Sequence, residues 1–569
     1  MSAAPDTAAP SGPAERAAQA WLRLPGAMRA RLLLGSVGGP HLLDVVDQGL
    51  CAAAELGGPD QLSALHACAD VALTAWGDSP LDGGMAGRIL CTPALYAALA
   101  PEQQAALKFL AERWALPEEG SYFHRLAQRR EPEKLARFLD AQIGKEPDNF
   151  FWRHQALALA LFEGDGERAE RALDFEASQE MLPVAAAALA RIRELTGDPA
   201  EAARLYLATK DFFGPGYRVA RSGPALLRAG DRDGAILALR KAAAYGPWRV
   251  SERLVLHDLT QGVDAETAPL PGSLAVLLYS WNKAAELDAT LSALHASDLT
   301  FAADVKLFVL DNGGADETPA VVKRWAEAFG TERFETITLP TNVGAPAARN
   351  WLMRLPGVMK RDFALYLDDD AEVPADWLGR FGALVGRYPD AGAWGCKVVD
   401  HAASRIVQSA DLHLMFPRGM DPARPDLDLS ATDPNPFRLS DLHVLGLDTG
   451  LFDHARPCAS VTGCCHLFRT ATLLDNGGFS LYLSPSQYDD MEHDLRLCKA
   501  RKFPAYSGHL VVRHKKRTGA ASRVSRSEEM SALGNKYKMQ VLHDRAEIEA
   551  SLAAERELLE ADLLAKIRR

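Results

Sequence analysis

Residues 363–370 read Phe-Ala-Leu-Tyr-Leu-Asp-Asp-Asp, an apolar run that leads directly into three successive carboxylates. Such a run is typical of a buried strand. Three neighbouring carboxylates cannot be buried as anions without a counter-charge, because an unpaired buried charge is costly. A divalent cation would supply that charge, so the stretch predicts a strand that ends at a metal site. The alternative is an acidic turn in solvent.

The strand also sets the direction of the three side chains. In an extended chain successive side chains point to opposite sides, which places Asp368 and Asp370 together and Asp369 opposite. Carboxylate oxygens suit hard cations. We therefore expect Asp368 and Asp370 to share one Mg²⁺ or Mn²⁺ ion, directly or through water.

Three more apolar runs precede this one, at residues 274–279, 306–310 and 334–339, with helical stretches between them. Strands that alternate with helices predict crossover units and a mainly parallel sheet. Ligands of such sheets bind outside the carboxyl ends of the strands. The run at 306–310 ends at Asp311, so a second acidic group is expected at the same edge.

The first half of the chain has a helical pattern with a repeat of 33 residues. A Gly-Asp turn recurs, followed by an alanine five positions after the glycine, which ends one helix and lets the next pack closely. The three copies are Gly164-Asp165 with Ala169, Gly197-Asp198 with Ala202, and Gly230-Asp231 with Ala235. The repeat resembles the tetratricopeptide family, although that family's period is nearer 34 and its signature is incomplete here. A non-repeating helical bundle is the alternative.

A series of motifs in the second half resembles the family 2 glycosyltransferases of the GT-A fold. In chain order they are LLYSWN (277–282), VLDNG (309–313), NVGAPAARN (342–350), LDDD (367–370), VTGCCHLFR (461–469), GGF (477–479) and YDDME (488–492). The resemblance covers about residues 270–520. It implies metal-dependent transfer of a sugar from a nucleotide-diphosphate donor, with a UDP-sugar favoured.

The resemblance also implies roles for individual residues. Donor-binding positions are Ser280, Asn282, Asp311, Asn342, Gly344, Arg349, Asp368 and Asp369. Asp368, Asp370 and His514 would hold Mn²⁺ or Mg²⁺, because the leaving diphosphate needs a cation already in place. Asp490 would be the general base of an inverting single displacement, with Glu492 as the second catalytic acid.

The acidic stretch that contains Asp490 has a second interpretation. Asp489, Glu492 and Asp494 crowd the same segment, and mutual repulsion should raise at least one pKa, as suits a base. Acidic residues are also common in the first turn of a helix, where they match the dipole. The family's second aspartate is Glu492 here, and its usual Phe-Asp-Glu is Phe479-Ser480-Leu481, so the acceptor side departs from the pattern.

The expected fold class is an all-α helical-repeat region followed by a Rossmann-like, mainly parallel α/β domain. The expected organisation is a disordered lead (1–14), an α-helical domain (15–130), tetratricopeptide-like repeats (131–261), a GT-A domain (270–520) and a C-terminal helical extension (526–569). We expect residues 262–272 to form the linker, and the proline-rich segment 417–436 to form a surface loop near the acceptor entrance.

Composition limits the partners and the location. The net charge of −12 makes nucleic acid an improbable partner, and no apolar run approaches the about 18 residues that cross a bilayer. Eight cysteines without a CxxC pair indicate reduced thiols and a cytoplasmic protein. We expect Cys464, Cys465 and His466 to form core or cleft wall, because further metal ligands at suitable spacing are missing.

Three questions stay open at this point. The acceptor is either a protein held by the repeats or a saccharide or lipid-linked glycan. The C-terminal stripe of Ile548, Leu552, Leu559 and Leu563 predicts a docking face or a homodimer contact. A catalytically inactive binding platform is the alternative function. A sugar-nucleotide pyrophosphorylase fits less well, since a Gly-rich basic loop is absent at 280–283.

Overall fold

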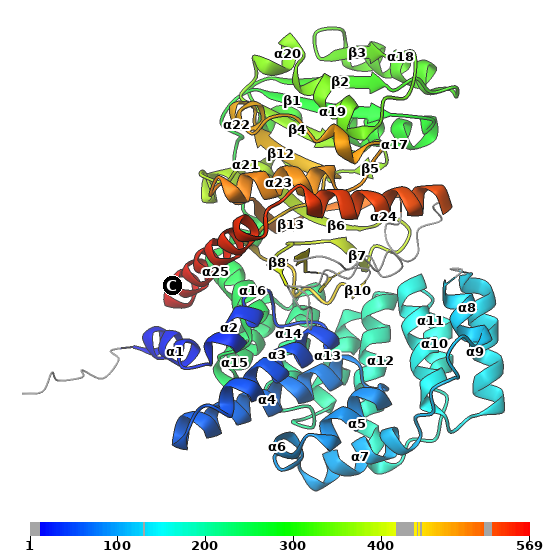
Figure 1. Ribbon diagram of the computed structural model, residues 1–569, viewed down its shortest axis with the longest axis vertical. Coiled ribbons are helices and arrows are strands. Elements are labelled where there is room, and N and C mark those ends of the chain that lie inside the picture. The colour runs from blue at the N-terminus through cyan, green and yellow to red at the C-terminus, as the bar shows by residue number, and fades with distance from the viewer. Residues whose placement is uncertain (1–11, 129–130, 417–436, 441, 444–445, 517–525) are drawn as a thin grey trace, which may run out of the picture. The chain divides into compact units, whose positions relative to one another are not determined.

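The computed structural model describes residues 12–128, 131–416, 437–440, 442–443, 446–516 and 526–569 (Figure 1). The chain forms two compact units, one of residues 1–261, 446–451 and 560–569, the other of residues 262–445 and 452–559. The second unit begins at the first residue of the expected linker. The expected surface loop at 417–436 and residues 1–11 of the expected lead lie outside the described ranges. No helix within those ranges combines the length and apolarity needed to cross a bilayer.

The first unit is built mainly from helices (Figure 1). They are α1 (Pro13–Leu22), α2 (Gly26–Leu32), α3 (Gly39–Ala53), α4 (Gly58–Asp78), α5 (Gly83–Cys91), α6 (Pro93–Tyr96), α7 (Pro101–Glu112), α8 (Tyr122–Gln128), α9 (Pro132–Lys145), α10 (Phe150–Glu163), α11 (Gly166–Ala172), α12 (Leu182–Thr196), α13 (Pro199–Ala208), α14 (Tyr217–Arg228), α15 (Arg232–Tyr245) and α16 (Val250–Gln261). From α10 to α16 each helix packs against the next.

The three Gly-Asp turns share one geometry. Each glycine is left-handed, with φ between 79° and 88°, and each aspartate caps the next helix by accepting a hydrogen bond from the backbone N–H three residues on. The alanine that follows is fully buried in every copy. Only glycine adopts this φ without strain, which explains why the residue recurs. The turns are thus built as the sequence predicts, while the tetratricopeptide assignment stays a prediction.

A buried arginine joins helices from both predicted N-terminal regions. Arg221 of α14 donates two hydrogen bonds of 2.7 Å to Asp78, the last residue of α4, and a third of 3.2 Å to Glu252 of α16. The side chains of Arg221 and Glu252 are almost completely buried, and that of Asp78 is 12% exposed. Since the partners neutralise each other, the interior can hold these charges.

A largely parallel sheet forms the centre of the second unit (Figure 1). Its principal strands run in the order β7-β6-β12-β4-β1-β2-β3, and β13 pairs with β6, β5 and β11. The strands are β1 (Leu274–Ser280), β2 (Val305–Asp311), β3 (Phe334–Thr338), β4 (Phe363–Leu367), β5 (Ala371–Glu372), β6 (Trp394–Asp400), β7 (Ile406–Ser409), β11 (Ala455–Pro457), β12 (Cys465–Arg469) and β13 (Ala505–His514). A separate pair joins β8 (Leu414–Met415) and β9 (Arg438–Leu439).

Helices cover both faces of this sheet. Leu274, Val276 and Leu278 of β1 pack with α17 (Ala284–Ala296), α18 (Thr318–Phe329) and α21 (Trp377–Arg387). The alternate residues Ala275 and Leu277 pack with α19 (Ala345–Met353), α22 (Thr470–Asp475) and α23 (Asp489–Lys499). Burial on both faces explains the unbroken apolar runs. The expected fold class is confirmed as a helical N-terminal region and a mainly parallel sheet with helices.

The C-terminal helices are α24 (Arg526–Val541) and α25 (Arg545–Arg568). The predicted apolar stripe of α25 is buried, with Ile548 and Leu552 in one cluster with Leu495 of α23 and Met539 of α24. These side chains are therefore covered by the same chain. The stripe docks the helix on its own molecule, and the expectation of a homodimer through it loses its basis.

Candidate active site

A solvent-open cleft of about 340 Å³ lies within the second unit. Its walls include Arg349, Asp368, Asp490 and His514, which are four of the predicted site residues, together with Gln408 and Cys464. A space of this size can hold a ligand larger than a simple ion. The fold thus gathers residues from distant parts of the sequence around one opening.

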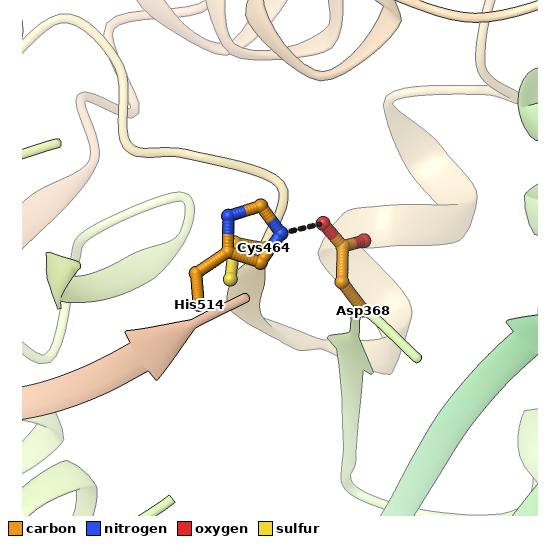
Figure 2. A group of neighbouring side chains, drawn as sticks. All are labelled: Asp368, Cys464 and His514. Carbon is orange, nitrogen blue, oxygen red and sulfur yellow. Dashed lines mark ion pairs between the residues drawn. The ribbon is translucent and has the colours of Figure 1, made fainter. Parts of the chain in front are cut away.

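Strand pairing explains how three of these residues meet. Asp368 follows β4 and Cys464 precedes β12, and these strands pair antiparallel so that the Asp368 backbone N–H donates to the Cys464 carbonyl at 2.9 Å. His514 ends β13 and lies beside Ala371 of β5, three residues after Asp368. One ligand atom from each of Asp368, Cys464 and His514 lies within 4.8 Å of the others, and Figure 2 shows the three side chains.

The acidic triplet differs from the extended arrangement expected from the sequence. Asp369 and Asp370 lie in a turn, with the Ala371 N–H pointing back to the Asp368 carbonyl at 3.3 Å. Lys283 Nζ bridges Asp369 Oδ1 at 3.0 Å and Asp370 Oδ2 at 2.9 Å. Simple alternation would have separated these two carboxylates. Lys283, which sequence reasoning did not assign to the site, supplies part of the counter-charge.

His514 contacts the carboxylates of both Asp368 and Asp370. Its Nε2 lies 2.9 Å from Asp370 Oδ1 and 3.7 Å from Asp368 Oδ2. Burial disfavours the imidazolium form, but the hydrogen bond and charge of Asp370 and the charge of Asp368 outweigh burial and raise the pKa of His514.

The three carboxylates have different ionisation tendencies. Burial raises the pKa of Asp369 to about 6 and also raises the pKa of Asp368, against the charges of Lys283 and His514. Burial would raise the pKa of Asp370 as well, yet His514 and Lys283 lower it below its ordinary value. The residues at the end of β4 therefore form a coupled acidic group that a cation would stabilise as anions.

Arg349 links this group to the start of α23. Its Nη1 donates to Asp489 Oδ2 at 2.8 Å, and its Nη2 lies 4.0 Å from Asp368 Oδ1. The guanidinium also lies over the rings of Tyr279 and Phe479, at 5.7 and 5.2 Å from their centroids. Burial raises the pKa of Asp489, as does the charge of Asp490, while Arg349 opposes the shift. Arg349 is thus held rigidly with one edge at the cleft.

The two predicted catalytic acids lie in different surroundings. Asp490 lines the cleft, and its carboxylate accepts hydrogen bonds from the backbone N–H groups of Gly463 at 2.7 Å and Met491 at 2.9 Å. Glu492 is not among the lining residues, and its Oε1 accepts a 3.0 Å hydrogen bond from Arg496. Both belong to the acidic first turn of α23. Only Asp490 can meet a molecule in the cleft directly.

The remaining predicted donor-binding residues gather at the carboxyl ends of β1, β2 and β3, outside the lining of the cleft. They are Ser280, Asn282, Asp311, Asn342 and Gly344. Asn282 accepts a hydrogen bond from the Ala315 N–H at 2.7 Å, and Asn342 accepts one from the Gly344 N–H at 2.8 Å. Parallel pairing puts Ser280 beside Asp311. These residues form one polar edge of the sheet, as the strand pattern predicts.

Two further residues of the site were missed or set aside in the sequence. Gln408 of β7 accepts a hydrogen bond at Oε1 from His514 Nδ1 at 2.9 Å, and no motif marks it. Cys464 is buried but lines the cleft, whereas Cys465 is fully buried away from it and His466 lies 3.1 Å from Asp494 in the interior. The adjacent position of Cys464 and Asp368 on paired strands could be found only with the strand register.

Residues 275–435 match the family model described as "Glycosyl transferase family 2". This segment is therefore a family 2 glycosyltransferase domain. The presence of this domain assigns glycosyltransferase activity to the chain. No curated protein matches the sequence.

Several solved structures resemble the chain at low sequence identity. A mannosyltransferase from Pyrobaculum calidifontis, PcManGT in complex with GDP-Man and Mn²⁺, is 15% identical over 56% of this chain and 84% of that chain, with a TM-score of 0.34. GalNAc-T7 with UDP, GalNAc and Mn²⁺ is 11% identical over 47% of each chain, with a TM-score of 0.35. TarS of S. aureus is 14% identical over 43% of this chain and 36% of that chain, with a TM-score of 0.30.

Proposed function

We propose that the second unit transfers a sugar, with inversion, from a nucleotide-diphosphate donor to an acceptor hydroxyl, and that a UDP-sugar is the favoured donor. The observation that carries this proposal is the close contact of His514 with Asp368 and Asp370 at an open cleft that also contains Asp490. A donor diphosphate is anionic, and this acidic edge would repel it without a cation. Together the residues fit a metal-dependent transferase.

The metal would be held by Asp368, Asp370 and His514, with Mn²⁺ or Mg²⁺ as the expected ion. The chemistry of the group fits a divalent cation, since carboxylate oxygens and an imidazole nitrogen converge there. When bound, the cation would neutralise charge on the diphosphate as the anomeric bond breaks. Lys283 would keep Asp369 and Asp370 ionised and in place.

Asp490 would act as the general base. Its carboxylate is fixed by the Gly463 and Met491 N–H groups, so it can accept the proton of an acceptor hydroxyl as that oxygen attacks the anomeric carbon. One such displacement inverts the anomeric centre. Glu492 would contribute indirectly, because it holds Arg496, whose Nη2 donates to the Gly478 carbonyl at 2.8 Å.

The polar edge at β1, β2 and β3 would bind the nucleoside part of the donor. Ser280, Asp311 and Asn342 offer hydrogen-bonding groups there, and Asn282 and Gly344 shape the two turns. Arg349, which its hydrogen bond to Asp489 holds in place, would position the diphosphate part of the donor. Ligands of parallel sheets bind at this edge, which supports the assignment.

The double variant Asp368→Asn with Asp370→Asn tests the proposal. It should abolish metal-dependent release of nucleoside diphosphate from a panel of nucleotide sugars, because neither amide carries charge for the cation. Asp475→Asn, an exposed aspartate at the end of α22, is the matched control and should leave release unchanged. Full turnover by the double variant would contradict the assigned site and favour an inactive binding platform.

We also propose that the acceptor is a protein held by the helices of the first unit. Packing of α10 to α16 one against the next supports this, because stacked helical repeats present extended surfaces for peptides. Incubation of the full chain with labelled donor and with protein, oligosaccharide or lipid-linked acceptors distinguishes the options. Label on protein supports the proposal, and label on a glycan alone contradicts it.

A further inference from the structure

The thiol of Cys464 forms the third corner of the group with Asp368 and His514 (Figure 2). We infer that Cys464 is a direct ligand of the cation, and that its sulfur makes the site prefer a borderline cation such as Co²⁺ or Zn²⁺ to Mg²⁺. This inference rests on the proposed function, which puts a divalent cation at this place. It assigns a ligand that the acidic motif alone does not contain.

The backbone fixes the distance between Cys464 and Asp368. They occupy opposite positions just beyond the paired ends of β12 and β4, where Cys465 faces Leu367 and the 2.9 Å backbone hydrogen bond closes the ladder. Directly opposite residues of antiparallel strands project to the same face of a sheet. Among the described residues, the Cys464 thiol makes no hydrogen bond, so its sulfur has no competing partner.

Gln408 orients the imidazole of His514 toward the same point. The Gln408 amide nitrogen donates to the His514 carbonyl at 3.2 Å, which leaves its Oε1 to accept from Nδ1 at 2.9 Å. Nδ1 therefore carries a proton, and Nε2 is the nitrogen that faces Asp370 Oδ1 at 2.9 Å and Asp368 Oδ2 at 3.7 Å. Outer hydrogen bonds of this kind fix the tautomer of metal-binding histidines.

Asp370 lies outside the group whose ligand atoms converge within 4.8 Å. Its Oδ2 is already bound by Lys283 at 2.9 Å. We therefore infer that Cys464 joins the ligands proposed above, since Asp368, Cys464 and His514 are the three residues whose donor atoms already converge. Three protein ligands at a cleft leave a further position for an oxygen of the donor, as in metal sites that act on substrates.

The chemistry of the donor atoms sets the preference for the cation. One carboxylate oxygen, one imidazole nitrogen and one sulfur suit borderline cations, whereas Mg²⁺ favours oxygen ligands only. On binding, the thiol would yield its proton to solvent, and so would Nε2 of a protonated His514, because both atoms bind a cation only without their protons. Replacing the sulfur by a hydroxyl should therefore weaken Co²⁺ binding much more than Mg²⁺ binding.

Absorption spectroscopy of the full chain titrated with Co²⁺ tests the inference without any turnover. Wild type should develop a sulfur-to-cobalt charge-transfer band, and Cys464→Ser should lose the band and bind Co²⁺ at least about 10-fold more weakly. The double variant Cys51→Ser with Cys91→Ser removes the two exposed thiols and should retain the band. Circular dichroism of each variant checks that the chain is folded.

The outcomes separate the inference from the proposed function. Cobalt bound to wild type without the band, or a band that persists in folded Cys464→Ser, would overturn the sulfur ligand even if donor turnover depends on a cation. Failure of folded wild type to bind Co²⁺ would overturn it too. A band that depends on Cys464 would support the ligand assignment, and absence of donor turnover with Co²⁺, Zn²⁺, Mn²⁺ or Mg²⁺ would then count against the transferase proposal alone.

Discussion

The two predicted catalytic acids in the first turn of α23 differ in their access to the cleft, and this difference can be measured. Asp490 lines the cleft, whereas Glu492 contacts Arg496. If Asp490 is the general base, Asp490→Asn should reduce kcat by about 10² to 10⁴ with little change in the KM for the donor. Glu492→Gln should cost much less, because it weakens only the support given through Arg496. Steady-state kinetics of both variants test this expectation. Equal losses of kcat would contradict the different roles assigned to Asp490 and Glu492.

His543, in the segment between α24 and α25, gives a pH dependence of stability. Burial, with the charges of Lys499 and Arg496, lowers the pKa of His543 to about 4. The unfolded chain, with a pKa of about 6.5, binds the proton first, so stability is full above that value and falls as the pH drops toward 4. The loss from this group between pH 7 and pH 5 should be about 2 kcal/mol.

Urea unfolding at pH 7 and pH 5 checks this expectation. Wild type should lose more unfolding free energy between the two values than His543→Gln, in which the titrating group is absent. The comparison of two differences removes any constant cost of the substitution. If both proteins respond equally to pH, His543 is not the group responsible.

A residue of the site was predictable from the sequence where it directly follows a predicted strand. Asp311 and Asp368 follow apolar runs directly, so their place at the sheet edge could be predicted. Lys283 and Gln408 could not, because their roles depend on a turn and on a neighbouring strand that no local pattern reveals. The same holds for the left-handed backbone of Gln487 and Tyr488 at the start of α23.

At the scale of elements, the sequence predicts β1, β2 and β4, which are buried on both faces, and also β3, which is partly exposed. The apolar run at 363–367 coincides with β4, and the other three runs differ from β1, β2 and β3 by one or two residues. The chain departs from the extended form at Asp369, since it must turn before β5 at Ala371. Alternation therefore fails where the strand ends, and that is where the site begins.

The buried ion pairs between helices of the first unit make a second prediction at this scale. Arg221→Ala would leave Asp78 without its cation and Glu252 with Arg249 alone, at 3.6 Å, and we expect the unfolding free energy of the first unit to fall by about 3 to 5 kcal/mol. Arg204→Ala on α13 removes an exposed pair with Glu201 and should have little effect. Chemical unfolding monitored by circular dichroism compares the two variants. Similar losses of unfolding free energy would mean that burial of an ion pair does not determine its contribution to stability.

At the scale of the whole molecule, the order of the helical region and the sheet region along the chain was predictable. Which residues belong to each unit was not. The change of pattern after residue 261 predicts the start of the sheet unit. Residues 446–451 and 560–569 belong to the first unit, although they lie within or after the predicted catalytic region. Within that unit, β10 (Gly446–Leu447) packs on α10 and α12. No motif marks either segment, because their contacts are non-local and involve few residues.

The last residues of the chain should therefore stabilise its first helices. Glu560 of α25 accepts a 2.9 Å hydrogen bond from the indole of Trp21 in α1 and pairs with Arg29 of α2 at 3.0 Å. Trp21 is fully buried, so loss of its partner leaves an unsatisfied donor. Glu560→Ala should lower the unfolding free energy of the first unit by about 1 to 3 kcal/mol.

Hydrogen exchange measured by mass spectrometry places this effect in the structure. Peptides from residues 13–32 should exchange faster in Glu560→Ala than in wild type, while peptides from β1 and β4 should not change. Glu557→Ala, on an exposed position of the same helix, controls for the loss of a carboxylate. Trp21→Phe removes the same indole hydrogen bond from the other side and should accelerate exchange in the same peptides. Unaltered exchange at 13–32 in both Glu560→Ala and Trp21→Phe would show that the C-terminal segment does not stabilise the first unit, since two independent losses of one contact cannot both be silent if that contact holds the helices.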